Sequence, residues 1–193
     1  MMQRPVDTLQ ATPLLKNLSP LLLVAVLIFI LDQFTKWLIV QKLKISDYIP
    51  VIDGFFNIHH VRNRGAAFGI LQGQKMLLIV VTIAALGLIG YYYFHYRQNL
   101  WMRIGLGFLL GGALGNLIDR IRIGEVVDFL QFGLLPNYAW PTFNVADISV
   151  CVGTGMIFIL FYLERNETQQ LSLIHISEPT RPRLISYAVF CLK

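Results

Sequence analysis

The chain has 193 residues, of which 55% are hydrophobic and only 14% are charged. This composition is far more apolar than that of a typical soluble domain, so we predict a membrane protein. Sixteen Lys and Arg outnumber eleven Asp and Glu, but the basic residues form no run that could follow a phosphate backbone, which argues against a nucleic-acid partner.

Four segments are long and apolar enough to cross the hydrocarbon core, which takes about 20 residues of helix. The first segment, about residues 18–41, has an apolar run that ends at Leu31 and must continue through Asp32 and Lys36 to complete a span. Asp32 and Lys36 are four residues apart, so they share a helix face and can form an ion pair that lowers the cost of both charges. We favour a structural role for this pair over a chemical one.

The connection between the first and second spans combines an apolar pattern with a polar segment. Short strands on the membrane surface are predicted from the alternation of Val51, Phe55 and Ile58. Within residues 59–69, small residues would let a substrate backbone approach, and Asn63 could donate a hydrogen bond to a peptide. His59 and His60 are adjacent and lack a third spaced ligand, so we interpret them as solvated loop residues and not as a metal site.

The second and third spans differ in how they end. The second, about residues 76–95, is apolar and closes with tyrosines that suit the interfacial aromatic belt. The third, about residues 101–120, has a stripe of glycines that predicts close packing against a neighbouring helix, formed by Gly107, Gly111 and Gly115. It ends with Asn116 within one helical turn of Asp119 and Arg120, and we predict that these three residues form a polar clamp.

Two acids flank the start of the fourth span, about residues 145–164. Asp128 lies between apolar residues in the preceding loop, where burial favours the neutral carboxyl. Asp147 follows Asn144 by three residues at the helix start, where the macrodipole favours a carboxylate. A protonated and an ionised acid side by side are what an aspartic peptidase requires. The alternative is that Asp147 is only a capping acid and Asp128 an ordinary loop acid.

Successive spans alternate in direction, so the ends of spans one and three and the start of span four share one membrane face. Four of the eleven acids therefore gather on that face: Asp32, Asp119, Asp128 and Asp147. Basic residues do not orient the bundle, because eight lie on this face and five on the other before Gln170. A transporter or proton-conducting subunit is a second interpretation, but spans two and four carry no carboxylate at mid-depth to extend a relay.

Five blocks of sequence occur in an order that resembles the lipoprotein signal peptidase (signal peptidase II) family. They are Asp32–Lys36, Val61–Phe68, Gly111–Arg120, Val126–Phe129 and Phe143–Asp147. The resemblance covers roughly residues 21–163. It implies an all-α membrane fold of four transmembrane helices, with a small periplasmic β-cradle and a surface helix between spans one and two. We place this single membrane-embedded peptidase domain at residues 1–170.

The resemblance also implies an activity. The family consists of aspartic endopeptidases of the bacterial inner membrane, which remove the signal peptide of diacylglyceryl-modified prolipoproteins before the lipidated cysteine. Asp128 and Asp147 match the catalytic pair, with no metal or other cofactor. Residues that match positions supporting the site or the substrate are Asp32, Lys36, Asn63, Gly112, Asn116, Asp119, Arg120 and Asn144.

Further properties follow from the same resemblance. The active site is expected at the periplasmic face and both termini in the cytoplasm, which supplies the orientation that the basic residues do not. The enzyme is expected to be a monomer surrounded by membrane lipids and to be inhibited by globomycin-type compounds.

Residues 171–193 match no family tail and resemble translated adapter sequence, so we exclude them from functional argument. One of the two cysteines, Cys191, lies in this tail, and Cys151 lies in the fourth span. They lack the C-x-x-C spacing that would indicate a zinc site or a redox pair.

Overall fold

A computed structural model describes residues 13–66, 70–135 and 138–177. The elements in chain order are α1 (Pro13–Lys42), β1 (Tyr48–Ile52), β2 (Phe56–Asn63), α2 (Lys75–Tyr96), α3 (Leu100–Arg122), β3 (Val126–Leu135), β4 (Tyr138–Ala139) and α4 (Val145–Ser177). Contacts divide the chain into two compact units, residues 1–158 and residues 159–193. α1 to α3 and the strands belong to the first unit, and α4 continues from the first unit into the second.

The predicted tail falls partly on α4. This helix continues through residue 170 as far as Ser177. The rest of the tail, residues 178–193, lies outside the described residues.

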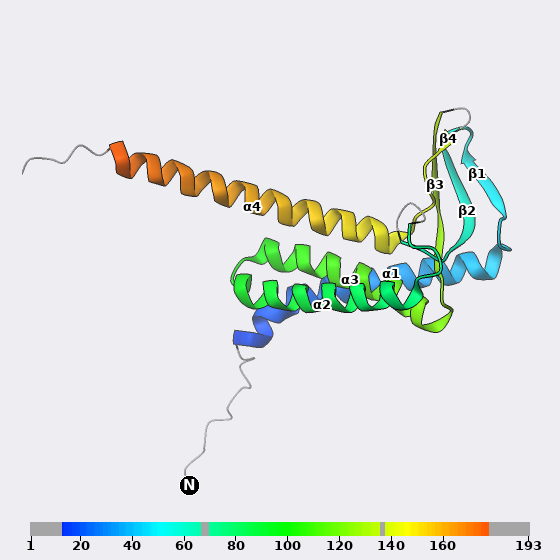
Figure 1. Ribbon diagram of the computed structural model, residues 1–193, viewed down its shortest axis with the longest axis horizontal. Helices are drawn as coiled ribbons and strands as arrows, with labels where there is room; N and C mark the ends of the chain where they lie inside the picture. Colours follow the sequence, from blue (N-terminus) through cyan, green and yellow to red (C-terminus); the bar gives the residue numbers. More distant parts are fainter. Residues whose placement is uncertain (1–12, 67–69, 136–137, 178–193) are drawn as a thin grey trace, which may run out of the picture. The chain divides into compact units, whose positions relative to one another are not determined.

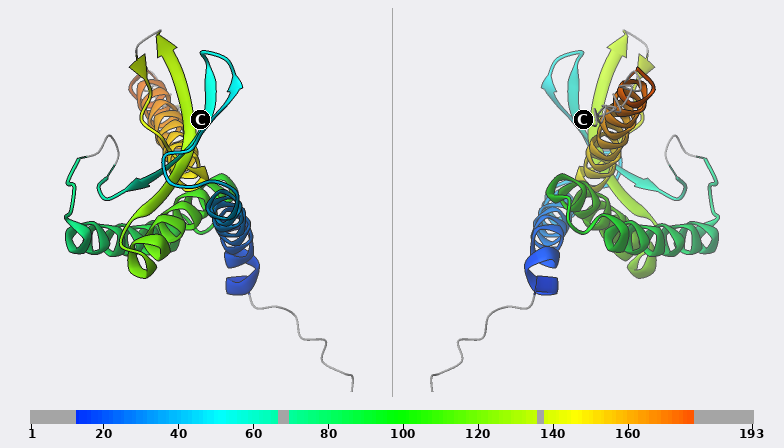
Figure 2. Two further views of the ribbon diagram at one scale, coloured as in Figure 1. Left: turned by 90° about the vertical axis from the view of Figure 1, so that its right-hand side faces the viewer. Right: turned by 90° about the vertical axis from the view of Figure 1, so that its left-hand side faces the viewer.

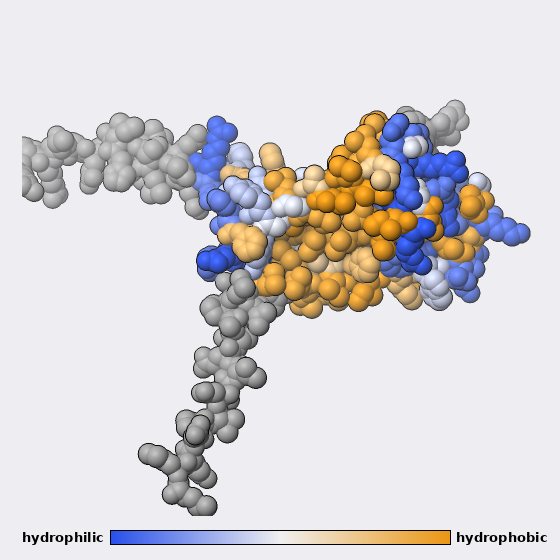
Figure 3. Space-filling model, turned by 60° about the horizontal axis from the view of Figure 1, so that its bottom comes forward, coloured by the Kyte–Doolittle hydropathy of each residue, from blue (hydrophilic) through white to orange (hydrophobic). Residues whose placement is uncertain are grey.

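Each of the four helices contains a stretch that could cross a membrane. These stretches are Pro20–Lys42, Lys75–Tyr96, Leu100–Arg122 and Val145–Asn166, and they confirm the predicted four-helix membrane fold. Within the first unit α3 contacts both α1 and α2, and these three helices run side by side (Figure 1). Large apolar side chains such as Leu23, Phe34 and Val80 point outward. Figure 3 shows an apolar surface over the helices, with hydrophilic residues at the end that carries the sheet. Lipid is the solvent that such a surface requires.

The glycines of α3 let α1 approach at backbone distance, as the four-residue spacing predicts. A Cβ added at Gly107 would lie 2.8 Å from the carbonyl oxygen of Leu21, and one added at Gly111 would lie 2.7 Å from that of Ala25. Both distances are shorter than van der Waals contact, and the obstacle is backbone that cannot rotate away. The contact between α1 and α3 therefore depends on having glycine, which has no side chain, at these two positions.

Replacing Gly111 by Ala tests this packing. We expect Gly111→Ala to lower the free energy of unfolding by about 1–3 kcal/mol, because the new methyl group forces two helix backbones apart. Gly90→Ala in α2 is the matched control, since a Cβ at Gly90 meets no atom within 4 Å. There, the better helix propensity of alanine should leave stability unchanged or raise it by up to about 1 kcal/mol. Unfolding in mixed detergent micelles measures both, and equal effects of the two variants would contradict the packing argument.

The four strands form an antiparallel sheet in the order β1-β2-β3-β4. This sheet, which Figure 2 shows from both sides, corresponds to the predicted β-cradle. A turn at Gly124, where φ is +81°, leads from the end of α3 directly into β3. The register of β2 on β3 pairs Val61 with Asp128 and Asn63 with Val126. Asp128 is therefore held between the end of α3 and the last residues of β2.

The surface helix that we predicted between α1 and α2 is not formed by the described residues of that segment. Residues 43–66 and 70–74 consist of strands, turns and extended chain. Leu71 and Gly73 have φ values of 60° and 76°, which interrupt a right-handed helix. The Gly73 N–H instead donates to the carbonyl oxygen of Arg64 at 3.2 Å, which closes a loop.

Candidate active site

Asp128 lies in strand β3, and not in a loop as the sequence suggested, and it is almost fully buried. Asn144 Nδ2 donates to Asp128 Oδ1 at 2.7 Å, and Asn63 Nδ2 donates to Asp128 Oδ2 at 3.0 Å. Each oxygen thus receives one hydrogen bond from a neutral amide. We expected Asn63 to donate a hydrogen bond to a peptide, but one of its amide hydrogens is donated to the Asp128 carboxyl.

Asp147 lies in the first turn of α4 and is half-buried. Its Oδ1 accepts a hydrogen bond from Asn116 Nδ2 at 2.8 Å, and its Oδ2 accepts one from the Asn144 backbone N–H at 3.1 Å. Asn144 Oδ1 in turn accepts from the Asp147 N–H at 3.0 Å. This reciprocal pair is a capping box, which begins the helix at this point. Asp147 therefore does cap the helix, as the alternative interpretation states. A capping role alone, however, does not require the hydrogen bond from Asn116 to the other carboxylate oxygen.

The environment of Asp128 favours its protonated form. Burial is the main cause that raises the pKa of Asp128 from 3.8 to about 7, and the negative charge of Asp147 adds to it. Hydrogen bonds from Asn63 and Asn144 and the charge of Lys36 act in the opposite direction. The neutral form expected from the apolar sequence around Asp128 is thus supported. Near neutral pH this carboxyl can hold a proton that it can also release.

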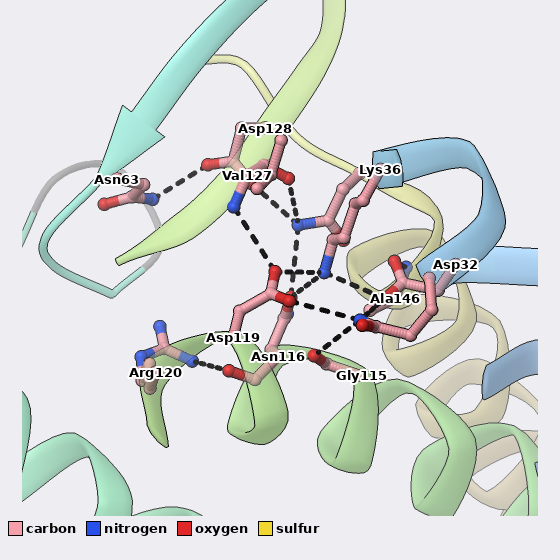
Figure 4. A network of polar contacts seen from close by, with 12 residues as sticks. Asp32, Lys36, Asn63, Gly115, Asn116, Asp119, Arg120, Val127, Asp128 and Ala146 are labelled. Carbon is pink, nitrogen blue, oxygen red and sulfur yellow. Dashed lines mark hydrogen bonds and ion pairs between the residues drawn. The ribbon is translucent and has the colours of Figure 1, made fainter. Parts of the chain in front are cut away.

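Lys36 joins Asp32 of α1 and Asp119 of α3 in a buried ion network. Its Nζ lies 2.8 Å from Asp32 Oδ2 and 2.9 Å from Asp119 Oδ2. The predicted pair between Asp32 and Lys36 is therefore confirmed, and a second carboxylate completes it (Figure 4). Asp32 Oδ1 also accepts a hydrogen bond from the Ala146 N–H at 2.9 Å, so this acid of α1 holds the start of α4.

Gln33 belongs to the same network, and our sequence argument missed it. Its Nε2 lies 3.2 Å from Asp32 Oδ2, 3.1 Å from Asp119 Oδ1 and 3.3 Å from the Gly115 carbonyl oxygen. Those contacts tie α1 to α3. An amide next to an acid inside an apolar span was the available indication, because an uncharged polar group at that depth also needs a partner.

The predicted clamp of Asn116, Asp119 and Arg120 needs correction. The Asn116 side chain makes its hydrogen bonds with Lys36, Asn144 and Asp147. Arg120 instead donates to two backbone carbonyls, that of Gly65 at 2.9 Å and that of Asn116 at 3.4 Å. The helical offsets of the three residues were right, but contacts with α1, α4 and the loop after β2 decide where the polar groups point.

Gly112 brings α4 close to α3 beside the acids. A Cβ at this position would collide with Ser149 Oγ and would lie 2.5 Å from the Ala146 carbonyl oxygen. Any side chain here would push the first turn of α4, and Asp147 with it, away from Asn116. The absence of a side chain at Gly112 therefore allows α3 and α4 to approach each other here.

Both aspartates line one cavity of about 980 Å³. Its polar wall also includes Asn63, Asn116 and Arg120. Its apolar wall comes from α2 and α4 and includes Val81, Ala85, Val150 and Val152. The polar region around the two aspartates thus continues into a space that apolar groups can fill.

His60 is buried in β2, so our interpretation of it as a solvated loop residue is wrong. The β-bulge between Ile58 and Val61 places it under the turn that follows α1. There its Nδ1 lies 3.0 Å from the carbonyl oxygen of Leu43. His59 also lies in β2 and not in a loop, and it is half-buried where it lines the cavity.

Comparison with known proteins decides the family. Residues 24–163 match the family model described as signal peptidase (SPase) II. The chain belongs to the signal peptidase II family. All ten predicted site residues fall inside the matched segment. The chain is therefore a membrane-bound protease of lipoprotein processing.

Individual members of the signal peptidase II family match most of the chain. The lipoprotein signal peptidase of Bacillus pumilus is 44% identical over 149 residues, which cover 77% of this chain and 96% of that protein. The lipoprotein signal peptidase of Bacillus subtilis is 42% identical over 149 residues, with the same coverage. That of Halothermothrix orenii is 42% identical over 140 residues, covering 72% of this chain and 93% of that protein.

The fold of this signal peptidase II chain also matches a solved structure. A bacterial membrane enzyme determined by the in meso method at 2.3 Å resolution superposes with a TM-score of 0.72 and 39% sequence identity. The match covers 77% of this chain and 91% of that protein. The fold is thus shared with a membrane enzyme.

Proposed function

We propose that this protein is an aspartic endopeptidase that removes the signal peptide of diacylglyceryl-modified bacterial prolipoproteins. In this proposal it cleaves the peptide bond before the lipidated cysteine, and Asp128 and Asp147 activate the attacking water. The proposal rests mainly on one observation: both carboxyls line the same cavity. One comes from a strand and the other from a helix, and each has both oxygens bound by hydrogen-bond donors.

The two carboxyls can divide the chemistry of hydrolysis between them. Asp147, as the carboxylate, takes a proton from water while the water oxygen attacks the peptide carbonyl carbon. Asp128, as the acid, gives its proton to the carbonyl oxygen, which produces a neutral tetrahedral diol. Asp147 then returns its proton to the leaving nitrogen as the C–N bond breaks, and Asp128 regains one from a diol hydroxyl. The pKa of Asp128 near 7 supports its role as the acid at the outset, although coupled acids titrate as a pair.

The walls of the cavity suit a lipidated substrate. The apolar residues of α2 and α4 continue from the aspartates toward the part of the bundle that lipid surrounds. The acyl chains of the precursor already lie in the bilayer, so an apolar wall that continues toward lipid can accept them without exposing them to water. Lodged among these side chains, the diacylglyceryl group would hold the neighbouring peptide bond at the carboxyls.

The proposed setting is the bacterial cytoplasmic membrane. We propose that both termini lie in the cytoplasm and that the sheet and the aspartates lie at the periplasmic face. We also propose that the enzyme acts as a monomer among membrane lipids and is blocked by globomycin-type inhibitors. These assignments rest on membership of the signal peptidase II family together with the four spans.

A cleavage assay on two forms of one precursor tests the reaction and the substrate together. The purified protein in lipid or detergent is given a prolipoprotein whose cysteine carries diacylglycerol, and separately the same precursor without the lipid. We expect release of the signal peptide from the modified precursor and at least a roughly 100-fold lower rate from the unmodified one, of the order expected when about 3 kcal/mol of binding energy is lost. Equal rates would contradict the assigned substrate, and no cleavage of either would contradict the peptidase.

A further inference from the structure

Asparagine amides supply the side-chain hydrogen bonds to the catalytic pair, and two of these amides are oriented by the backbone. The Gly65 N–H donates to Asn63 Oδ1 at 2.9 Å, and the Asp147 N–H donates to Asn144 Oδ1 at 3.0 Å. A backbone N–H cannot accept a hydrogen bond, so each amide must turn its NH₂ group to the other side. In both cases that side faces Asp128.

Asn116 is oriented differently, by a buried charge on another helix. The three hydrogens of Lys36 Nζ match three acceptors: Asp32 Oδ2 at 2.8 Å, Asp119 Oδ2 at 2.9 Å and Asn116 Oδ1 at 2.9 Å. The Lys36 side chain is only 3% exposed, and its ammonium has no hydrogen left to offer to another group. Because the ammonium can only donate, Asn116 keeps its oxygen on Lys36 (Figure 4). Its NH₂ group therefore points to Asp147 Oδ1, at 2.8 Å.

We propose that Lys36 is a positioning residue for the reaction, which fixes the Asn116 amide so that Asp147 receives a hydrogen-bond donor. The inference rests on the proposed function, in which Asp147 is the carboxylate that takes the proton of water. An Asn116 amide turned by about 180° would set its oxygen against Asp147 Oδ1. Those two acceptors could stay together only if Asp147 held a proton, and the carboxyl would then be unable to act as the base.

A second donor reaches Asn116 but does not replace Lys36. Asn144 Nδ2 lies 3.1 Å from Asn116 Oδ1, 2.7 Å from Asp128 Oδ1 and 3.3 Å from the Val127 carbonyl oxygen. An amide nitrogen has two hydrogens for these three acceptors. The shortest contact goes to Asp128, so Asn116 and Val127 share what remains. Without Lys36 the orientation of Asn116 would depend on that shared hydrogen.

The variant Asn116→Asp separates orientation from shape. The new carboxyl has the size of the amide and keeps one oxygen on Lys36, but it presents an oxygen to Asp147 in place of the NH₂ group. At neutral pH we expect turnover about 100-fold below wild type, as when a preorganised donor is lost. Two carboxyls in contact bind one proton more readily than a separate carboxyl does, so near pH 5 the new carboxyl can hold a proton and donate it to Asp147. The ratio of variant to wild-type turnover should then rise about tenfold or more. The charged groups around this position are Asp32 and Lys36 on α1, Asp119 and Arg120 on α3, Asp128 on β3 and Asp147 on α4.

Two further variants test the donor at position 116 and the role of Lys36 separately. Asn116→Ala offers no donor at any pH, so its turnover relative to wild type should stay low at both pH values. The double variant Lys36→Met with Asp119→Asn removes one positive and one negative charge, which leaves the net charge of the buried network unchanged. It should have a melting temperature clearly above that of Lys36→Met alone and lose about tenfold or more in turnover.

The results separate this inference from the proposed function. An Asn116→Asp variant whose pH profile follows that of the wild type overturns the role of the donor. A folded Lys36→Met/Asp119→Asn protein with wild-type turnover overturns the role of Lys36. If the wild-type protein itself fails to cleave a diacylglyceryl-modified precursor, the proposed function is what fails.

Discussion

Asp128→Asn and Asp147→Asn should each abolish cleavage of a diacylglyceryl-modified precursor, with turnover falling by about 10⁴-fold or more. Asparagine has the size of aspartate, but it can neither take a proton from water nor give one to a carbonyl oxygen at neutral pH. The proposed reaction uses one carboxyl as base and the other as acid. The carboxyl that remains in either variant therefore cannot carry out both proton transfers. Single-turnover cleavage with excess enzyme measures the chemical step directly.

The matched control is Asp53→Asn, a change of the same chemistry at an exposed position in the turn between β1 and β2. It should leave cleavage at the wild-type rate. Substantial turnover by either Asp128→Asn or Asp147→Asn would contradict the assignment of the catalytic pair. An equal loss in Asp53→Asn would point to a general effect on the protein instead.

Loss of activity in Asp128→Asn should not come from loss of stability. The folded protein holds the Asp128 proton up to about pH 7, whereas in the unfolded chain this pKa is near 3.8. The stabilising effect of that proton is complete at low pH and is lost as pH rises toward 7, above which the wild type carries a buried charge. The neutral asparagine avoids this cost. We therefore expect the melting temperature of the variant, relative to wild type, to be higher at about pH 8 than at about pH 5.

Local sequence patterns predicted the parts of this site that depend on one helix. Asp32 and Lys36 pair because a helix brings residues four apart onto one face, and the glycines of α3 pack against α1 for the same reason. The order of the spans was enough to gather four acids at one membrane face. Membership of the family, and the residues expected to act, followed from five sequence blocks.

Features that depend on register and on packing between elements could not be predicted in this way. The burial of His60 depends on a β-bulge, which shifts every later side chain of β2 relative to simple alternation. The partners of Asn116 lie on α1 and α4, so its helical neighbours on α3 gave the wrong ones. A surface helix was expected between α1 and α2, but the described residues of that segment form none, and the backbone is left-handed at Leu71 and Gly73.

The second large effect is expected from Lys36→Met, which should lower the free energy of unfolding by about 3–5 kcal/mol. Methionine fills the space of the lysine stem, so the change removes mainly the charge. Asp32 and Asp119 would then remain as two buried carboxylates with no cation between them. Equilibrium unfolding in mixed detergent micelles measures the loss. Lys42→Met, at an exposed position further along α1, is the matched control and should change stability by less than about 0.5 kcal/mol.

Adding Asp119→Asn to Lys36→Met should recover at least half of that lost stability. The repulsion between the two acids then disappears, and the amide oxygen introduced by Asp119→Asn can still accept a hydrogen bond from Gln33 Nε2 or from the Val127 N–H, which now donate to the carboxylate. Asp32 retains the Ala146 N–H and Gln33 Nε2 as donors. If the double variant were as unstable as Lys36→Met, the loss would come from packing around the lysine stem. Recovery of stability without recovery of turnover would instead show that this lysine serves the reaction as well as the fold.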